Sequence, residues 1–221
     1  MYTKRTMFAK NNFQETTHMK QNPRQRRKEK NQANILDVAT HLLITKGFDN
    51  VSLRDIAKHA DYSPAGLYKL FDSKAAIIKA VLVRHNEILM ERLEAVQSDP
   101  PHKQRLIQLC MEYIRFSLEN TAYLILLNNL SSERSSKKQA IPANSPYRIF
   151  YQAVKDWIKS ENIKVSNKYN VEEIAYALWA QIHGMATLRS SQLKNFEADF
   201  ESADQLTIEI YLYGIKNWEQ K

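Results

Sequence analysis

The chain has 221 residues, with 32 Lys and Arg, 24 Asp and Glu and six His, and a formal net charge of +8 at pH 7. One Cys and four Gly exclude an intrachain disulfide, a Cys-based metal cluster and the glycine-rich fingerprints of phosphate-binding loops. No apolar run reaches the roughly 18 residues that a membrane span needs, and residues 1–13 lack the apolar segment of a signal peptide. We therefore expect a soluble cytoplasmic protein without a cofactor or a metal.

Almost all of the positive charge lies at the start of the chain. Residues 1–30 carry nine Lys and Arg against two Glu, whereas the two charge signs balance over residues 31–98. Residues 1–23 are also polar and have no sustained period, so we predict a disordered basic arm there. Such an arm favours a polyanion partner such as nucleic acid, although a solvated tail that keeps the protein soluble fits as well.

Apolar residues recur at helical spacing from position 24 to the end of the chain, and no segment has a strand period. We predict helices at 24–46, 52–60, 64–71, 73–97, 103–119, 121–130, 146–161, 171–190 and 203–219. Residue pairs typical of helix N-termini occur at Ser52/Asp55, Ser63/Pro64, Asn170/Glu173 and Ser202/Gln205. The sequence therefore predicts an all-α fold.

Two short helices of this set have the layout of a helix-turn-helix. The segments 52–60 and 64–71 are joined by three residues, and a longer helix stands on each side of the pair. In a helix-turn-helix the second helix enters the major groove of DNA. On spacing alone, two short surface helices in an ordinary bundle remain an alternative.

The residues around this motif resemble the N-terminal domain of TetR-family transcriptional regulators. The matching segments are Ile35–Ala39, Lys46–Phe48, Val51–Ala57, Ser63, Leu67–Tyr68, Phe71 and Ser73–Lys74. The resemblance implies a helix-turn-helix DNA-binding domain over 24–72, followed over 73–221 by a connecting helix and a helical bundle for ligand binding and dimerisation. Three positions depart from the family pattern. Asp61 replaces the usual glycine, Gly66 lies one place later than the common glycine of the family, and Leu70 replaces a His or Tyr that commonly contacts a phosphate.

The spacing of the second short helix indicates which residues face outward. Leu67 and Phe71 lie four residues apart and are expected to face the core, which turns Ala65, Gly66 and Lys69 outward. The resemblance implies that these three point into the major groove. Small residues there would allow close approach to the bases, and the Lys would donate a hydrogen bond.

Further DNA contacts are expected around this helix. Arg54 matches a family position that can reach a guanine, and hydroxyl and amine groups near the helix starts would anchor phosphates. Basic residues of the arm would lie along the backbone or enter the minor groove. The complete predicted set is Ser52, Arg54, Ser63, Pro64, Ala65, Gly66, Tyr68, Lys69, Lys74, Arg24, Arg26, Arg27 and Lys28.

The second half of the chain carries a shorter resemblance. The segment Leu178–Ala186 resembles the Trp–His–Gly signature of one C-terminal class of TetR-type regulators, through Trp179, His183 and Gly184. Apolar stripes on the last two helices would pair with their symmetry mates in a four-helix bundle, or would complete the monomer core. The dimer candidates are Ile174, Leu178, Ile182, Met185, Ile208, Tyr211, Leu212, Ile215 and Trp218.

Aromatic and Met residues of the same half would suit a pocket for an apolar small molecule. The candidates are Leu109, Met111, Tyr113, Phe116, Tyr123, Leu127, Phe150, Tyr151, Trp157 and His183. Ordinary core packing explains each of them equally well. Cys110 is either a redox sensor or a buried small hydrophobe.

These observations predict a dimeric repressor that binds a palindromic double-stranded operator and is released by a small-molecule effector. Ligand binding would shift the helix at 73–97 and change the separation of the two recognition helices. The alternatives are a DNA-binding or architectural protein of the same fold without an effector, and a helical enzyme that has kept the motif. The sequence has no carboxylate pair, nucleophile–base spacing or i, i+4 His pair that would indicate an enzyme or a metal site.

Overall fold

The structure is a computed structural model that describes residues 22–47, 49–96, 101–129, 144–165 and 170–218. Within these ranges the chain forms helices and no strand, as the periodicity predicts. The helices are α1 (Pro23–Lys46), α2 (Leu53–His59), α3 (Pro64–Tyr68), α4 (Lys74–Glu94), α5 (His102–Glu119), α6 (Thr121–Asn129), α7 (Pro146–Ser160), α8 (Val171–Ser190) and α9 (Phe200–Asn217). None of those in the described ranges is both long and apolar enough to cross a membrane.

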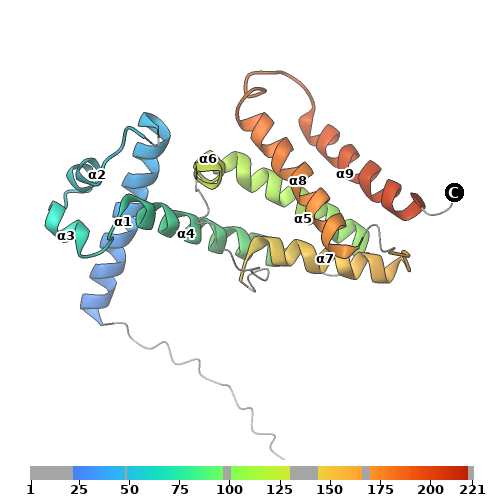
Figure 1. Cartoon of the computed structure of the whole chain (residues 1–221), viewed down its shortest axis with the longest axis horizontal. Helices are drawn as coiled ribbons and strands as arrows, with labels where there is room; N and C mark the ends of the chain where they lie inside the picture. Colours follow the sequence, from blue (N-terminus) through green and yellow to red (C-terminus); the bar gives the residue numbers. More distant parts are fainter. Residues whose placement is uncertain (1–21, 48, 97–100, 130–143, 166–169, 219–221) are drawn as a thin grey trace, which may run out of the picture.

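Helices α1, α2 and α3 form a small group at one end of the molecule (Figure 1). Helix α1 contacts α2 and the start of α4, and α2 contacts α3. Their shared core consists of fully buried aliphatic side chains, among them Ile35, Leu43, Ile56 and Leu67. Burial of this stripe holds two helices that are too short to be stable alone.

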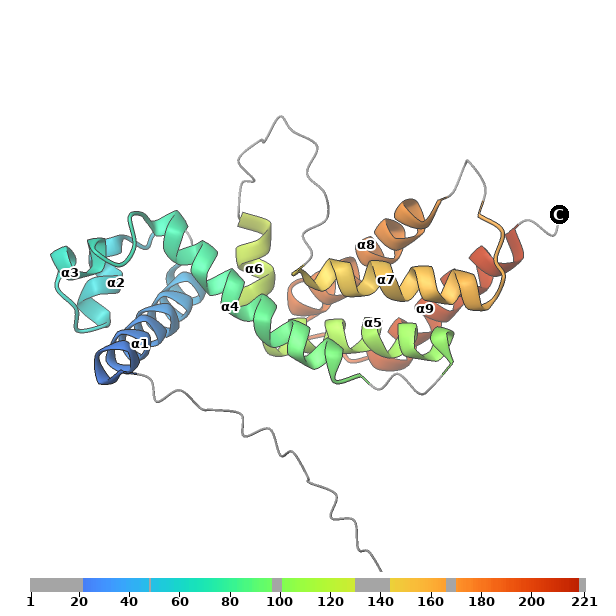
Figure 2. The same cartoon turned by 90° about the horizontal axis from the view of Figure 1, so that it is seen from below.

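The C-terminal group is built on three helices, α5, α7 and α8, which pack on one another. Helix α9 lies along α5 and α8, and α6 contacts α4, α5 and α1 (Figures 1 and 2). The centre of this group is aromatic, because Tyr113, Phe116, Phe150 and Trp157 are all fully buried. The contact between α6 and α1 joins the two groups beside the path of α4.

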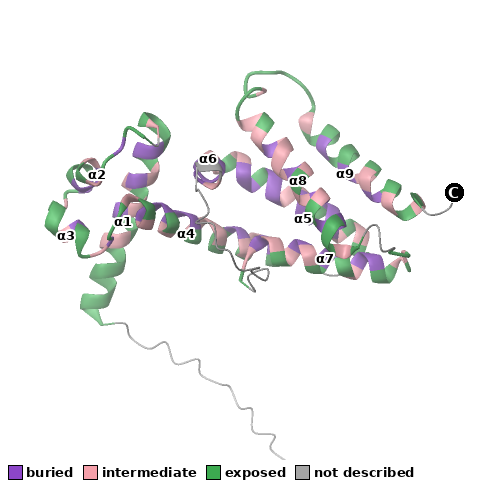
Figure 3. Ribbon diagram, viewed as in Figure 1, coloured by how far each residue is buried: buried purple, intermediate pink, exposed green. Residues whose placement is uncertain are grey.

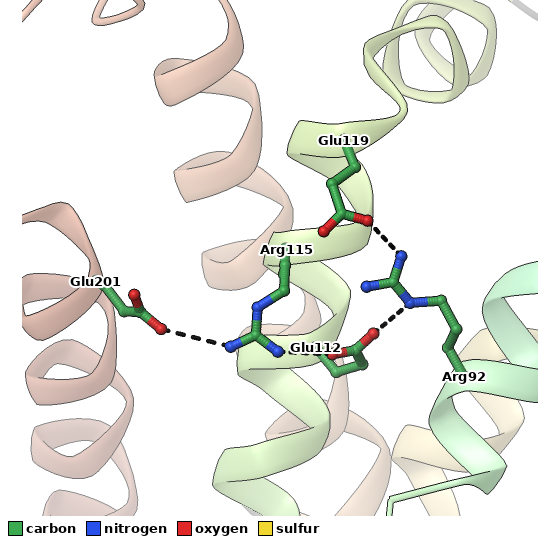
Figure 4. A network of polar contacts seen from close by, with 5 residues as sticks. All are labelled: Arg92, Glu112, Arg115, Glu119 and Glu201. Atoms are coloured by element: carbon green, nitrogen blue, oxygen red, sulfur yellow. Dashed lines mark hydrogen bonds and ion pairs between the residues drawn. The ribbon is translucent and has the colours of Figure 1, made fainter.

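Helix α4 connects the two groups and is fixed at its far end by ion pairs (Figure 4). Arg92 on α4 binds Glu112 and Glu119 of α5, the latter at 2.5 Å. Arg115 of α5 pairs with Glu112 at 2.9 Å and with Glu201 of α9 at 3.4 Å. The network therefore joins α4, α5 and α9, while the start of α4 lies beside the helix-turn-helix.

Three predicted helix boundaries are corrected by the structure. Helix α4 ends at Glu94, three residues before the predicted end. Helix α3 ends at Tyr68, although the amides of Leu70 and Phe71 still bind the Leu67 carbonyl oxygen at 2.9 Å and continue the turn. Helix α9 begins at Phe200, three residues before the predicted start. Its N-cap is Asp199, whose carboxylate accepts from the amide of Ser202, so the cap predicted at Ser202 is wrong.

Candidate nucleic-acid interface and effector cavity

Both short helices start at the N-caps that the sequence predicts. The Ser52 hydroxyl accepts from the Asp55 amide at 3.1 Å, and the Asp55 carboxylate accepts in return from the Ser52 amide at 2.9 Å. Hydrogen bonds that the Ser52 hydroxyl and the Ser52 amide donate to the Asp55 carboxylate hold the pKa of that carboxyl below its usual value. The Ser63 hydroxyl accepts from the Gly66 amide at 3.0 Å. The two caps fix the first residues of α2 and of α3.

The turn between the two helices uses a left-handed residue. Asp61 has φ 54°, a region that glycine adopts without cost and that Asp tolerates better than most residues. Helix α1 supports the turn, because the Asn34 amide donates to the Ala60 carbonyl oxygen at 3.3 Å and Asn31 donates to the Tyr62 hydroxyl at 3.5 Å. The departure from glycine at position 61 therefore keeps the backbone geometry at a cost in strain.

Gly66 does not face outward as predicted. A Cβ at this position would lie 2.9 Å from the Ser63 hydroxyl and 2.9 Å from the ring of Tyr62. The glycine is needed because the N-cap side chain and the tyrosine ring of the turn both pack against the first turn of α3. These two side chains fill the space that the missing Cβ leaves, and a contact between half-exposed Gly66 and DNA stays a prediction.

Figure 3 shows that much of α3 is exposed, and the exposed residues around it include polar and basic side chains. Pro64, Ala65 and Lys69 are exposed, as are Arg54 on α2 and Tyr68, whose side chain is 51% exposed. Leu67 is buried as predicted, and Phe71 is buried beside it. The motif therefore offers small, aromatic and cationic side chains to a partner while its apolar residues point into the core.

Two predicted phosphate contacts are engaged within the protein. The Ser52 hydroxyl donates to the Asp55 carboxylate, so its proton is not available to a phosphate in this arrangement. The Lys74 ammonium donates to the Val51 carbonyl oxygen at 3.0 Å and ties the start of α4 to the residue before the first cap. Both side chains position the motif, and Ser63 keeps its hydroxyl proton because its oxygen acts as the acceptor.

The basic residues assigned to the arm belong to a helix. Pro23 is the first residue of α1, and the Asn22 side chain caps it by accepting from the Arg24 amide at 3.0 Å. Arg24, Arg26, Arg27 and Lys28 therefore lie exposed on the first turns of α1. A helical backbone cannot follow the minor groove as an extended arm would, so of the two predicted contacts the one along the DNA backbone suits these four residues better. The part of the arm before residue 22 lies outside the described residues.

Cations at this end of α1 oppose the helix dipole. The positive end of a helix favours Asp and Glu, yet the first turn of α1 contains no acidic residue. Each cation there costs roughly 0.3–1 kcal/mol at low ionic strength. An anionic partner such as a phosphate would remove this cost and would bind the same end of the helix.

A cavity of about 340 Å³ opens between the connecting helix and the C-terminal group. Its walls are Asn86 on α4, Tyr123 and Leu127 on α6, Ser145, Pro146 and Tyr147 at the start of α7, and Trp179 and His183 on α8. Three of the ten predicted pocket residues, Tyr123, Leu127 and His183, therefore line it. Tyr113 lies behind His183, and its hydroxyl is 2.8 Å from the Nδ1 atom of that ring.

The other predicted pocket residues do not line this cavity. Leu109, Phe116, Phe150 and Trp157 are fully buried core residues. Met111 borders a separate hollow of about 360 Å³ between α5 and α9, and Tyr151 donates to Glu172 at 2.7 Å on the surface. Whether an aromatic residue lies in the core or lines the cavity depends on how the helices pack, and residue type alone does not predict it.

Sequence reasoning missed five of the lining residues. Trp179 is the centre of an aromatic group, with ring centroids 5.4 Å from Tyr147 and 5.0 Å from Phe150. It was part of the Trp–His–Gly resemblance but was not assigned to the pocket. Asn has a low helix propensity, so its presence inside α4 is the one signal in the sequence that Asn86 has a role beyond the helix itself. Ser145, Pro146 and Tyr147 gave no such signal.

The predicted dimer stripes lie mainly inside the monomer. Ile174, Leu178, Ile182, Ile208 and Leu212 are all buried at the contact of α8 and α9 with the rest of the chain. Met185, Tyr211 and Ile215 are half-buried, and only Trp218 of the nine is exposed. The alternative that these stripes complete the monomer core is therefore correct for the five buried residues.

A different face of α8 and α9 is exposed and apolar. It carries Tyr176 and Leu188 on α8, and Leu206, Ile210 and Tyr213 on α9, each between 47% and 68% exposed. Gly184 and Gly214 lie at helical spacing within the same two stripes, and a Cβ on either would meet nothing within 4 Å.

Cys110 is fully buried on α5. Burial raises the pKa of its thiol, which keeps the thiol protonated and unreactive. Of the two alternatives for this residue, the buried hydrophobe is the one that fits.

An exposed helix-turn-helix, joined by one long helix to a larger helical bundle, defines a class of DNA-binding regulators. Residues 35–81 match the model for bacterial regulatory proteins of the tetR family, and residues 106–209 match the tetracyclin repressor-like C-terminal domain. The chain belongs to the tetR family of DNA-binding transcriptional regulators. The Trp–His–Gly subclass stays a prediction.

Known proteins resemble this chain over most of its length. A helix-turn-helix-type transcriptional regulator of Staphylococcus aureus (strain USA300) is 20% identical over 183 residues, which cover 82% of this chain and 92% of the relative. The crystal structure of a tetR-family regulatory protein from Rhodococcus RHA1 has a TM-score of 0.63 at 18% identity, covering 84% and 97% of the two chains. The regulator PfmR from Thermus thermophilus has a TM-score of 0.58 at 17% identity, covering 87% and 96%. The two structures share the fold.

Proposed function

We propose that the chain acts as a homodimeric repressor that binds a palindromic operator and is released from it by a small-molecule effector. The proposal is carried by two exposed surfaces of opposite character. One is the polar and basic surface of α3 and its surroundings, and the other is the apolar face of α8 and α9.

The DNA side of the proposal rests on the exposed part of the motif. Lys69 and Arg54 would donate to base edges, Ala65 would approach the bases closely, and Tyr68 and Ser63 would bind phosphates. The cations on the first turns of α1 would add a contact with the backbone that depends on salt. One α3 helix of five residues reads few bases, so a second copy is needed for a specific site.

The dimer side rests on the glycines and exposed apolar residues of α8 and α9. Glycine within a helix costs about 1 kcal/mol relative to alanine, and no neighbour in the described part of the chain crowds Gly184 or Gly214. Small residues allow two helices to approach closely, and Tyr176, Ile210 and Tyr213 would supply the apolar contact area. The exposed stripes of two copies would then form a four-helix bundle around a two-fold axis.

The effector side rests on the position of the cavity. Asn86 in its wall belongs to α4, whose first residue lies beside the helix-turn-helix and whose last turns are fixed by the Arg92 network. A ligand that binds better to one position of α4 than to another would shift the equilibrium between them. A change in the separation of the two α3 helices would then lower the affinity for the operator.

Selection of bound sequences from a random DNA pool tests the dimer and the operator together. The full-length protein should enrich an inverted repeat whose half-sites lie about one helical turn apart, and the protein should sediment as a dimer. Lys69→Ala serves as the control, because it should reduce the enrichment of the inverted repeat while the protein still sediments as a dimer. A single unrepeated motif bound by a monomer would overturn the proposal.

The selected operator then tests the effector. Titration of the protein–operator complex with a compound that binds the cavity should release the DNA. A complex that stays intact with the cavity occupied would favour the alternative of a DNA-binding protein of this fold without an effector.

A further inference from the structure

The cavity next to α4 has no charged side chain among its described walls. Its lining consists of aromatic and aliphatic residues together with the amide of Asn86, the hydroxyls of Tyr123, Ser145 and Tyr147 and the imidazole of His183. A charged ligand would lose its water there without gaining an ion pair, which is costly. The volume of about 340 Å³ lies at the lower end of the range for small-molecule sites.

Asn86 presents a hydrogen-bond donor to this cavity. Tyr123 is buried, and its hydroxyl donates its single proton to the Oδ1 atom of Asn86 at 2.8 Å. A buried phenol needs an acceptor, so this contact fixes the orientation of the carboxamide. Among the described residues, nothing accepts from the amide nitrogen of Asn86, and its two protons are left for an occupant of the cavity.

His183 presents a second donor by the same reasoning. The buried Tyr113 hydroxyl is 2.8 Å from Nδ1 of His183. The Ser117 hydroxyl makes no hydrogen bond with the described residues, so Nδ1 is the partner that they offer to the Tyr113 hydroxyl, and a buried phenol donates its proton to that partner. The ring proton of His183 therefore lies on Nε2. Burial lowers the pKa of His183, which keeps the ring neutral at pH 7.

The aromatic wall completes the site. The ring of Trp179 meets the edge of Tyr147 at an interplanar angle of 88°, with 5.4 Å between centroids. Indole and phenol rings held at right angles form an apolar corner that suits a flat hydrocarbon group. The corner is formed by α7 and α8, and the two donors come from α4, which carries Asn86, and from α8, which carries both Trp179 and His183.

We infer that the cavity binds an uncharged, flat and mainly apolar molecule that carries a carbonyl oxygen, which accepts hydrogen bonds from Asn86 and His183. This inference rests on the proposed effector function, because it assigns a ligand class to the same cavity. Among the described walls of the cavity, a carboxylate would find no cation and an ammonium would find no carboxylate.

Three probes of equal shape test the ligand class by calorimetric titration of the full-length protein without DNA. They are 2-acetylnaphthalene, 2-isopropenylnaphthalene, in which a methylene group replaces the oxygen, and 2-naphthoate. We expect the ketone to bind about tenfold tighter than either of the others. The hydrocarbon gains more from leaving water, so a preference for the ketone requires donors in the site.

Asn86→Asp tests the donor on α4. The carboxylate still accepts from Tyr123 but has no protons to donate, so the preference for the ketone should fall to about twofold. The same variant should bind 1-(2-naphthyl)ethylammonium about tenfold tighter than the unchanged protein does. Asn86→Leu, which removes both roles, is the second variant if Asn86→Asp does not fold. Glu87→Gln, an exposed residue outside the cavity, is the matched control and should change nothing.

The results separate this inference from the proposed function. Tightest binding of 2-naphthoate, equal binding of the ketone and the hydrocarbon, no binding of any probe, or an unchanged preference in Asn86→Asp would each overturn the inference. If the ketone binds with the expected preference and the operator stays bound, the proposed release by an effector fails and the ligand class stands.

Discussion

The surfaces of α3 and α9 differ in the residues that they leave exposed. Around α3 these are small, basic and phenolic, and the apolar Leu67 and Phe71 are buried. On α9 the exposed residues include Leu206, Ile210 and Tyr213. A polar surface that binds DNA is well solvated in the free protein. A surface of large apolar side chains is poorly solvated, and such patches are typical of sites that another surface covers. The difference fits the proposal that the first surface binds DNA and the second binds another copy of the chain.

Ile210→Glu should produce the largest effect, because it places a charge in the centre of the exposed apolar face. We expect a monomer and a loss of operator affinity of at least about 100-fold, equivalent to roughly 3 kcal/mol. Sedimentation and operator titration measure the two effects. Val83→Glu, which changes an exposed apolar residue of α4 in the same way, is the control and should remain a dimer. A dimeric Ile210→Glu protein with normal operator affinity would end the assignment of α9 to the interface.

Lys69→Ala and Arg54→Ala should each weaken binding to the specific site by about 1–3 kcal/mol. Binding to unrelated DNA should change much less, since a base contact adds little there. Competition titrations on the selected operator and on a scrambled duplex measure the ratio. Equal losses on both duplexes would assign the two side chains to phosphates.

The double variant Arg24→Glu/Arg27→Glu should change stability and DNA binding in opposite directions. Acidic residues suit the positive end of α1 and should stabilise the fold by a few tenths of a kcal/mol or more. The slope of log affinity against log salt should fall by about 0.9 for each phosphate contact that is lost. Thermal unfolding and a salt series measure the two quantities. An unchanged slope would show that this end of α1 does not contact DNA.

Asp61→Gly should give the smallest effect. Removal of the Cβ at φ 54° relieves the left-handed strain and should stabilise the protein by about 1 kcal/mol, or roughly 2–4 °C in the unfolding midpoint. Asp61→Asn removes the charge but keeps the strain, so any stabilisation that it shares with Asp61→Gly must come from electrostatics. No gain in Asp61→Gly beyond Asp61→Asn would mean that the turn is not strained.

The two regions also differ in how far the sequence predicts them. The helix-turn-helix depends on contacts between residues three or four positions apart, such as Ser52 with Asp55 and Ser63 with Gly66, and these were predicted apart from the orientation of Gly66. That error has a local cause too, because the ring of Tyr62 folds over the glycine. Short-range signals therefore define the DNA-binding group almost completely.

The C-terminal half depends on contacts between distant positions. The cavity joins Asn86, Tyr123, Tyr147 and His183 from four helices, and no spacing along the chain relates them. Helix α8 also has apolar residues on two sides, and periodicity alone does not decide which side covers the monomer. Only the packed helices show that the stripe through Ile174 is internal and that the stripe through Tyr176 is exposed.

The depth of Cys110 makes this protein convenient for spectroscopy. It is the only cysteine of the chain, and thiol reagents do not reach it in the folded state. A cysteine introduced in place of an exposed residue, such as Glu87 in the middle of α4, would therefore accept a spin label without removal of the native thiol. In the proposed dimer, pulsed electron paramagnetic resonance would measure the distance between the labels on the two α4 helices. This distance could be followed as DNA and small molecules are added.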